Sequence, residues 1–206
     1  MIYVDPPFDL GETLSGTDSD GNLTNAHWCG AVFEFPDVDR TPGLRGGKSR
    51  RSGQALRAVC CRNTKGSALT VAAATYGLVL GFDVDSSTGR LAAGACAGRS
   101  LAENDWSGVG DPELGTTTVA DDDLFWLIIG GVVPCYAEGG IAVGAPVVAD
   151  AGTDGHVMAA TAAHIGNIMG VAVDAISDNN AGLVHLHVPY YCLLYTSPSP
   201  RDRQKS

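Results

Sequence analysis

The chain has 206 residues, 45% of them hydrophobic, so it can bury a core and is not expected to be disordered. Its formal net charge is −10, and no apolar run is long enough to span a bilayer. The N-terminus has no basic region followed by an apolar stretch, so we expect no signal peptide. Length and composition predict one globular domain or two small ones.

Residues 1–53 are expected to form an extended arm and a basic loop. The first 28 residues are rich in Gly, Asp, Thr and Pro and show little apolar pattern. Gly30 to Phe35 is typical of a strand, which should end at Pro36 because proline cannot donate to a β-ladder. Residues 36–53 then form the basic, Gly-rich loop of this prediction.

Residues 54–191 are expected to form a β-rich domain, because short β-branched or aromatic runs recur between Gly, Asn and Asp residues. Residues 55–62 predict a strand and residues 63–66 a turn. Residues 85–89 predict a hairpin connection, whereas residues 98–122 are polar and irregular.

The sequence "DLFWLIIGG" predicts the start of a buried strand, with a bulge or bend at Gly130-Gly131. A strand–turn–strand pattern then occurs twice, and the pattern leaves room for a short helix near residues 101–104 or 159–164. The whole pattern of about nine or ten short strands indicates an all-β fold, a small β-sandwich or barrel with an extended N-terminal arm.

Basic residues are concentrated in one segment, from Arg40 to Lys65, which no acidic residue interrupts. One such segment in an acidic protein favours an electrostatically directed contact, although a solvated loop explains it equally well. Aromatic residues that would stack on bases are absent from it, so a nucleic-acid partner is not favoured. The candidate partner-binding residues are Arg40, Arg45, Lys48, Arg50 and Arg51.

No pattern in the sequence indicates catalysis. His185 and His187 would share one face of a strand, and two imidazoles could begin a zinc site, but a third ligand is needed. Asp18–Asn22 and Asp121–Asp123 are explained better by a turn and a solvated loop than by cation sites. Gly47-Lys48-Ser49 resembles the end of a phosphate loop, but Pro42 occupies the position of its first glycine. We therefore expect no enzyme, no cofactor and no metal.

Residues 192–206 are expected to be a non-native tail. "CLLYTSPSPRD" can be written in codons that resemble a transposase-based sequencing adapter read in frame. The alternative is a Pro/Ser/Arg-rich interaction tail. If the tail is foreign, the native C-terminus is missing or ends near Tyr191, and the gene comes from a shotgun (metagenomic) assembly. The five remaining cysteines have no metal spacing and are expected to be buried, reduced thiols.

Three stretches, "GGVVPCYAEGGIAVGAPVVAD", "GHVMAA" and "IGNIMGVAVDAISDNNAGLVHLHV", cover most of residues 130–188. This region resembles the small phage capsid decoration, or cement, proteins. Upstream, "AVCCRNTKGSALT" and "DDDLFWLIIGG" resemble segments of larger phage virion proteins. The resemblance implies a β-rich protein that sits on an assembled head, often as a trimer, and reinforces the lattice; the long arm and basic loop depart from that pattern.

The sequence and this resemblance together predict a bacteriophage virion structural protein, specifically a capsid decoration protein that binds and stabilises the assembled head. Its expected partners are the major capsid protein lattice and further copies of itself, assembled in the host cytoplasm without a membrane. The alternative is a carbohydrate- or host-surface-binding β module of a virion fibre or tail. Exposed Trp28, Trp106 or Trp126 would be the anchors of such a module.

Overall fold

The structure is a computed structural model and describes residues 5–35, 55–73, 75–84, 91–97, 107–150, 152–153, 155–164 and 167–188. Regular structure in this part of the chain is almost entirely β, as the sequence predicted. No helix described in it has the length and apolar character needed to cross a membrane. The elements are β1 (Val32–Phe35), β2 (Leu56–Asn63), β3 (Leu69–Thr70), β4 (Val79–Val84), β5 (Leu91–Ala97), β6 (Ser107–Gly110), β7 (Thr118–Val119), β8 (Leu124–Ala137), β9 (Pro146–Ala149), β10 (Val157–Ala159), β11 (Gly170–Ala172) and β12 (Asn180–His187), with the 3-10 turns η1 (Ala26–Trp28), η2 (Pro112–Leu114) and η3 (Ala162–His164).

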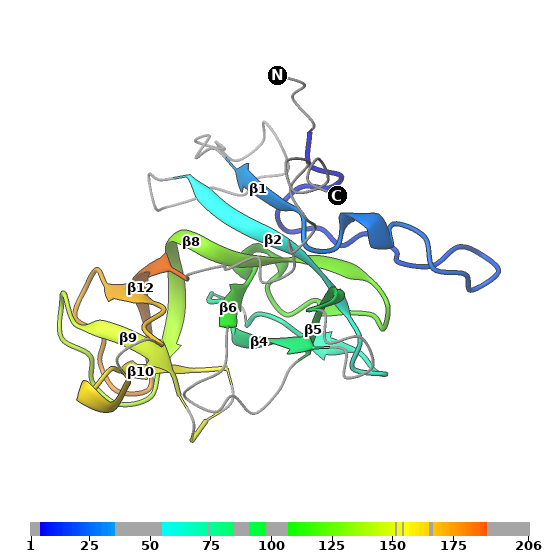
Figure 1. The fold of residues 1–206 in the computed structure, drawn as a ribbon. Coiled ribbons are helices and arrows are strands. Elements are labelled where there is room, and N and C mark those ends of the chain that lie inside the picture. Colours follow the sequence, from blue (N-terminus) through cyan, green and yellow to red (C-terminus); the bar gives the residue numbers. More distant parts are fainter. Residues whose placement is uncertain are drawn as a thin grey trace, which may run out of the picture.

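Strand pairing closes the sheet into a five-stranded barrel in the order β2-β5-β4-β6-β8, because β8 also pairs with β2. Of the two architectures that the sequence predicted, a sandwich or a barrel, the structure therefore has the barrel. The pairing order continues from β8 through β10, β9, β11 and β12 and returns to β8. This second ring is joined less firmly, because β10 meets β8 only at Val157 and Ala137. Figure 1 shows the two groups of strands on either side of the long β8.

The long strand β8 is shared between both rings. Its first part pairs with β2 and β6, and its second part pairs with β12. Gly130 and Gly131 lie between the two parts, and Gly131 has a φ of 98°, which favours glycine. The register between β2 and β8 also shifts at this point. The bulge or bend predicted at these glycines is therefore confirmed.

The first part of β8 is buried on both faces, since the side chains from Leu124 to Ile129 are all 0% exposed. Trp126 is covered by aromatic rings on one face. Its ring stacks on Phe8 at a centroid distance of 4.7 Å and meets Phe33 and Phe35 edge-on. Its indole N–H donates to the Phe8 carbonyl at 3.1 Å, which satisfies the polar atom that such burial would otherwise leave without a partner.

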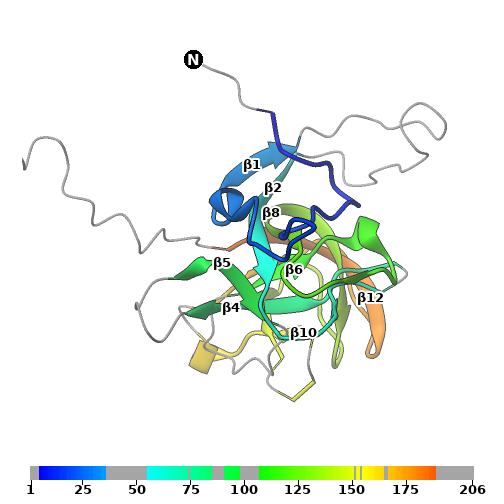
Figure 2. The same ribbon diagram turned by 90° about the vertical axis from the view of Figure 1, so that its right-hand side faces the viewer.

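The N-terminal segment supplies part of this cover. Figures 1 and 2 show the blue segment beside β1, β2 and the first part of β8. Phe8 and Leu10 are buried, and the backbone of Leu14 exchanges hydrogen bonds with Leu124. Between residues 5 and 28 the only regular element is η1. This stretch has little regular structure, yet it buries apolar side chains in the same core as the barrel.

The predicted strands and turns correspond closely to the structure. The strand predicted over residues 55–62 is β2, and β4 and β5 flank the predicted hairpin connection as an antiparallel pair. β9 with β10, and β11 with β12, are the two strand–turn–strand units. The turn after β2 is organised by buried Asn63, whose side-chain amide donates to the carbonyls of Ser67, Val119 and Ala120.

The prediction of an irregular segment over residues 98–122 is wrong for its described part, which contains β6, η2 and β7. Strand β6 has the sequence Ser-Gly-Val-Gly, which has little intrinsic preference for a strand. The glycines are needed because neighbours approach closely. A Cβ on Gly108 would lie 2.7 Å from the Leu127 side chain, and one on Gly110 would lie 2.0 Å from the Val71 carbonyl oxygen. Packing between β4 and β8 therefore determines this strand.

Candidate functional site

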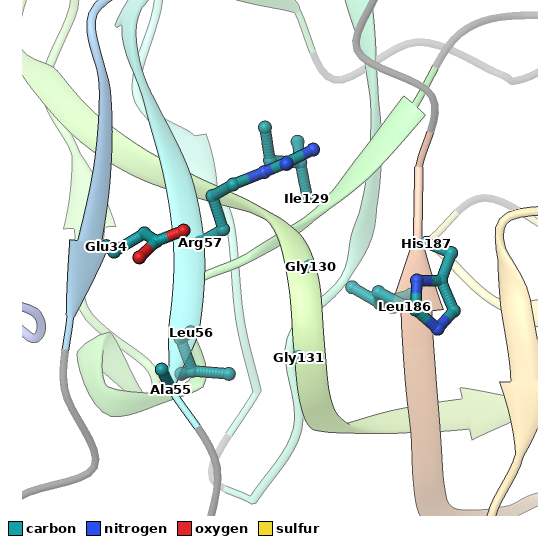
Figure 3. A pocket seen from close by; sticks show the side chains of 9 residues that line it. All are labelled: Glu34, Ala55, Leu56, Arg57, Ile129, Gly130, Gly131, Leu186 and His187. Carbon is teal, nitrogen blue, oxygen red and sulfur yellow. The ribbon is translucent and has the colours of Figure 1, made fainter.

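A pocket lies on the sheet surface at the bend of β8, and its volume is about 230 Å³. Four strands contribute to it: β1, β2, β8 and β12. Figure 3 shows the nine lining residues, with β8 crossing the middle of the pocket. They are Glu34, Ala55, Leu56, Arg57, Ile129, Gly130, Gly131, Leu186 and His187.

The pocket exists because two glycines occupy the bend. Arg57 of β2 and His187 of β12 are both register partners of Gly130, one on each side of β8. Since partners across a sheet present side chains on the same face, the Arg57 and His187 side chains flank a position that has none. The surface is therefore hollowed down to the backbone of β8 between a guanidinium and an imidazole.

The rim and the floor of the pocket differ in chemistry. Glu34, Arg57 and His187 are exposed, whereas Leu56, Ile129 and Leu186 are buried beneath the pocket. Glu34 is the register partner of Arg57 on the side away from Gly130. Figure 3 shows the Arg57 guanidinium extending over β8, away from the Glu34 carboxylate. The pocket thus combines donors at its mouth with an apolar interior.

The histidine pair of β12 lies together as the sequence predicted. The rings of His185 and His187 are 4.2 Å apart between centroids. Within the described ranges, however, no group of three His, Cys, Asp or Glu side chains is arranged to hold a metal ion. The Asp18–Asn22 segment forms the turn that we expected: the Asp18 carboxylate accepts hydrogen bonds from the backbone N–H groups of Asp20 and Asn22. The hydrogen bonds from Asn22 lower the pKa of this carboxyl.

The basic segment is described only in its last part. The candidate partner-binding residues Arg40, Arg45, Lys48, Arg50 and Arg51 lie outside the described residues. The basic residues of this segment that the structure describes lie apart from one another. Arg57 lies on the pocket rim, and the Arg62 Nε is 3.7 Å from a carboxylate oxygen of Asp122. Lys65 is exposed in the turn after β2. The tail, residues 192–206, also lies outside the described part of the chain.

The proposed tryptophan anchors need correction. Trp126 is wrong as a surface anchor, because its side chain is 0% exposed beneath Phe8, Phe33 and Phe35. Trp28 is partly buried and packs against the core, and Trp106 lies outside the described residues. The physical reason is that the first part of β8 is covered on both faces, so a large apolar ring there belongs to the interior.

Sequence reasoning missed an aromatic row that joins three distant segments. Tyr76 contacts Tyr136 at a ring-centroid distance of 4.8 Å, and Tyr136 contacts His156 at 4.6 Å. The His156 Nδ1 lies 3.2 Å from a carboxylate oxygen of Glu138. Tyr136 near the end of β8 and Glu138 just after that strand were the available signal, but nothing local indicates that the other two rings meet them.

Three of the described cysteines, Cys60, Cys61 and Cys135, are buried, and Cys29 is partly buried. Burial raises the pKa of Cys29, although nearby Arg62 acts in the opposite direction. Burial also raises the pKa of Cys60, with a smaller contribution from nearby Cys29, and it raises the pKa of Cys135 to about 12. Since the thiolate is the reactive form, the raised pKa lowers the reactivity of Cys29, Cys60 and Cys135, and the burial of Cys60, Cys61 and Cys135 agrees with the prediction of buried thiols.

Comparison with known proteins gave a likeness among solved structures. No family model matches the chain, and no curated protein matches it. Among solved structures, the chain is similar to the N base of head fiber gp8.5 of bacteriophage phi29, with 14% sequence identity and a TM-score of 0.41. The match covers 63% of this chain and 93% of that chain.

Proposed function

We propose that this chain is a bacteriophage virion structural protein and, more specifically, a decoration protein that binds and stabilises the assembled head. One observation carries the proposal. The stretch that resembles decoration proteins begins at Gly130 and ends at Val188, and the second strand ring begins at the same bend and ends with β12. A resemblance whose limits coincide with a structural unit is more informative than one that cuts across strands. The proposal includes no catalytic activity.

The attachment surface in this proposal is the basic segment with its candidate residues from Arg40 to Arg51. Its positive charge would contact an acidic region of the capsid lattice, and the rest of the chain is strongly acidic. Assembly would take place in the host cytoplasm, where the protein joins the finished head.

Co-sedimentation with heads tests the attachment. Purified protein is mixed with undecorated heads of the phage that carries the gene and centrifuged at low salt. We expect capture that weakens as salt rises, because screening shortens the range of exposed charges to about 10 Å at 0.1 M ionic strength. Replacing Arg45, Lys48, Arg50 and Arg51 by Ala should also weaken capture. Absence of capture at low salt would overturn the proposal.

A control that removes one positive charge fewer is available in the tail. Replacing Arg201, Arg203 and Lys205 by Ala removes three positive charges from the segment that we interpret as foreign. Capture should be unchanged in this variant. If the tail variant loses as much binding as the variant of the basic segment, net charge rather than the basic segment governs attachment.

Self-association as a trimer is part of the proposal. Its support is a set of exposed apolar side chains in the second strand ring, of which Val143 is 66% exposed. This part of the proposal requires that these side chains adjoin, because a contiguous exposed apolar patch marks an interaction surface. The others are Ile168, Val171 and Val173. Sedimentation velocity should give a trimer, and Val171→Asp with Val173→Asp should shift it to monomer; a monomeric parent protein would contradict this part.

The alternative, a glycan-binding module of a fibre or tail, has different anchors from those first predicted. The row formed by Tyr76, Tyr136 and His156, with Glu138 beside it, combines apolar rings with a carboxylate acceptor, which are the groups that recognise sugars. Glycan-array binding that Tyr76→Ala abolishes, together with failure to bind heads, would favour this alternative.

A further inference from the structure

We infer that the pocket at the bend of β8 is a receptor for a carboxylate on a short aliphatic stem, such as a glutamate or aspartate side chain or the end of a polypeptide chain. Neither the sequence nor any comparison assigns a role to this pocket. The inference is independent of what the virion partner is, and it would stand if head binding failed.

The first step is the placement of donors. Arg57 and His187 face one another across Gly130, each one strand away, so their backbones are separated by roughly 10 Å. Side chains reaching inward from that separation can approach both oxygens of one carboxylate. The guanidinium fork matches carboxylate geometry and always carries its charge, so Arg57 is the principal donor.

The second step concerns Glu34, the acidic group on the rim. Its register partner is Arg57, so it lies two strand spacings from Gly130, again roughly 10 Å. No ion pair within 4.0 Å joins the described side chains of Glu34 and Arg57, and Figure 3 shows the guanidinium turned the other way. The Arg57 donors are therefore directed over β8, while repulsion of a bound carboxylate by Glu34 is weakened by distance and solvent.

The third step concerns the stem. Below the charged rim the accessible lining is exposed Ala55 and the half-buried Gly130 and Gly131, which lie over the buried Leu56, Ile129 and Leu186. One or two methylene groups can be buried there, and each favours binding by about 0.8 kcal/mol when fully buried. A phosphate has no stem and would leave the apolar surface of Ala55 and the two glycines in contact with water. The charged rim and the apolar lining together therefore favour a carboxylate carried on a short hydrocarbon chain.

The experiment uses the full chain, labelled with ¹⁵N, at about 0.15 M ionic strength. The probe is blocked glutamate (N-acetyl-glutamic acid α-amide), and the comparison compound is its neutral isostere, blocked glutamine. We expect the glutamate probe to shift the amide resonances of Gly130 and Gly131 in a saturable way. It should bind about tenfold or more tightly than the glutamine probe, because charge-assisted hydrogen bonds are the stronger ones. Equal binding of the two probes would overturn the inference.

Variants distinguish the pocket from general electrostatics. Arg57→Gln should weaken binding of blocked glutamate about tenfold or more, whereas Arg62→Gln, the same chemical change at an arginine beside Asp122, should leave it within about twofold. Gly130→Val fills the floor without removing a charge and should also abolish binding. If Arg62→Gln weakens binding as much as Arg57→Gln, or if Gly130→Val has no effect, the pocket is not the receptor.

Two further probes identify the source of the carboxylate. N-acetylglycine carries a chain-terminal carboxylate, so tighter binding of it than of blocked glutamate assigns the pocket to a chain end. The reverse order assigns it to a side chain. Inorganic phosphate should bind more weakly than both; if it binds more tightly, the pocket is a general anion site and the inference is wrong.

Discussion

Substitution of the two glycines at the bend of β8 tests the architecture, because Gly131 has no room for a side chain and Gly130 has room for one. Gly131 has a φ of 98°, and a Cβ there would lie 2.6 Å from the Ala55 carbonyl oxygen and 2.6 Å from the Leu56 side chain. At Gly130 the nearest atom to an added Cβ is the Arg57 Cβ at 3.4 Å, an ordinary contact. We therefore compare Gly131→Ala with Gly130→Ala.

The magnitude for Gly131→Ala has two parts. An unfavourable backbone conformation costs roughly 1–3 kcal/mol, and overpacking against a neighbouring strand costs roughly 1–3 kcal/mol more. The expected loss of unfolding free energy is therefore about 2–6 kcal/mol, out of roughly 5–15 kcal/mol for a typical domain. For Gly130→Ala the reduced freedom of the unfolded chain offsets the new contact, so the change should stay within about 1 kcal/mol.

Urea unfolding, monitored by tryptophan fluorescence, measures the difference. With a slope of about 2 kcal/mol per molar urea, Gly131→Ala should lower the midpoint by about 1 M or more. The slope should be unchanged if the variant retains the native fold. Midpoints for the two variants that agree within error would refute the reasoning, because the bend would then not require a left-handed residue.

Three other predictions follow from the core, the thiols and the N-terminal turn. Trp126→Phe should lower the free energy of unfolding by about 1–3 kcal/mol in denaturant titrations, because the buried Phe8 carbonyl loses its donor; an unchanged midpoint would contradict this contact. The thiol of Cys135, whose pKa is raised to about 12, should resist iodoacetamide at pH 8 in folded protein and react after unfolding, as followed by mass spectrometry. The pKa of the Asp18 carboxyl should be found by NMR below the ordinary aspartate value of 3.8, since the hydrogen bonds from Asn22 favour the charged form. Its support of the turn should be present above that ordinary value and lost as pH falls through the lowered pKa, whereas an unshifted titration would show that the turn hydrogen bonds do not persist in solution.

Sequence alone was enough to determine the kind of fold and many of its local features. Short β-branched runs indicated strands, and the Asn63–Gly66 stretch indicated a turn; both properties depend on residues that are neighbours along the chain. The bend at Gly130-Gly131 could be predicted for the same reason, because the backbone freedom of glycine is local. The face shared by His185 and His187 followed from the two-residue period of a strand.

Only the tertiary structure decided which strands meet and what each face covers. Strand β6 is held by β4 and β8 rather than by its own residues, so its Ser-Gly-Val-Gly sequence carries no local signal. The burial of Trp126 depends on Phe8, which is far away in the chain and stacks on its ring. Arg57 and His187 become neighbours of one glycine because two different strands pair with the two parts of β8. The choice of pairing partner depends on packing and loop closure across the whole chain, and no short window of sequence contains it.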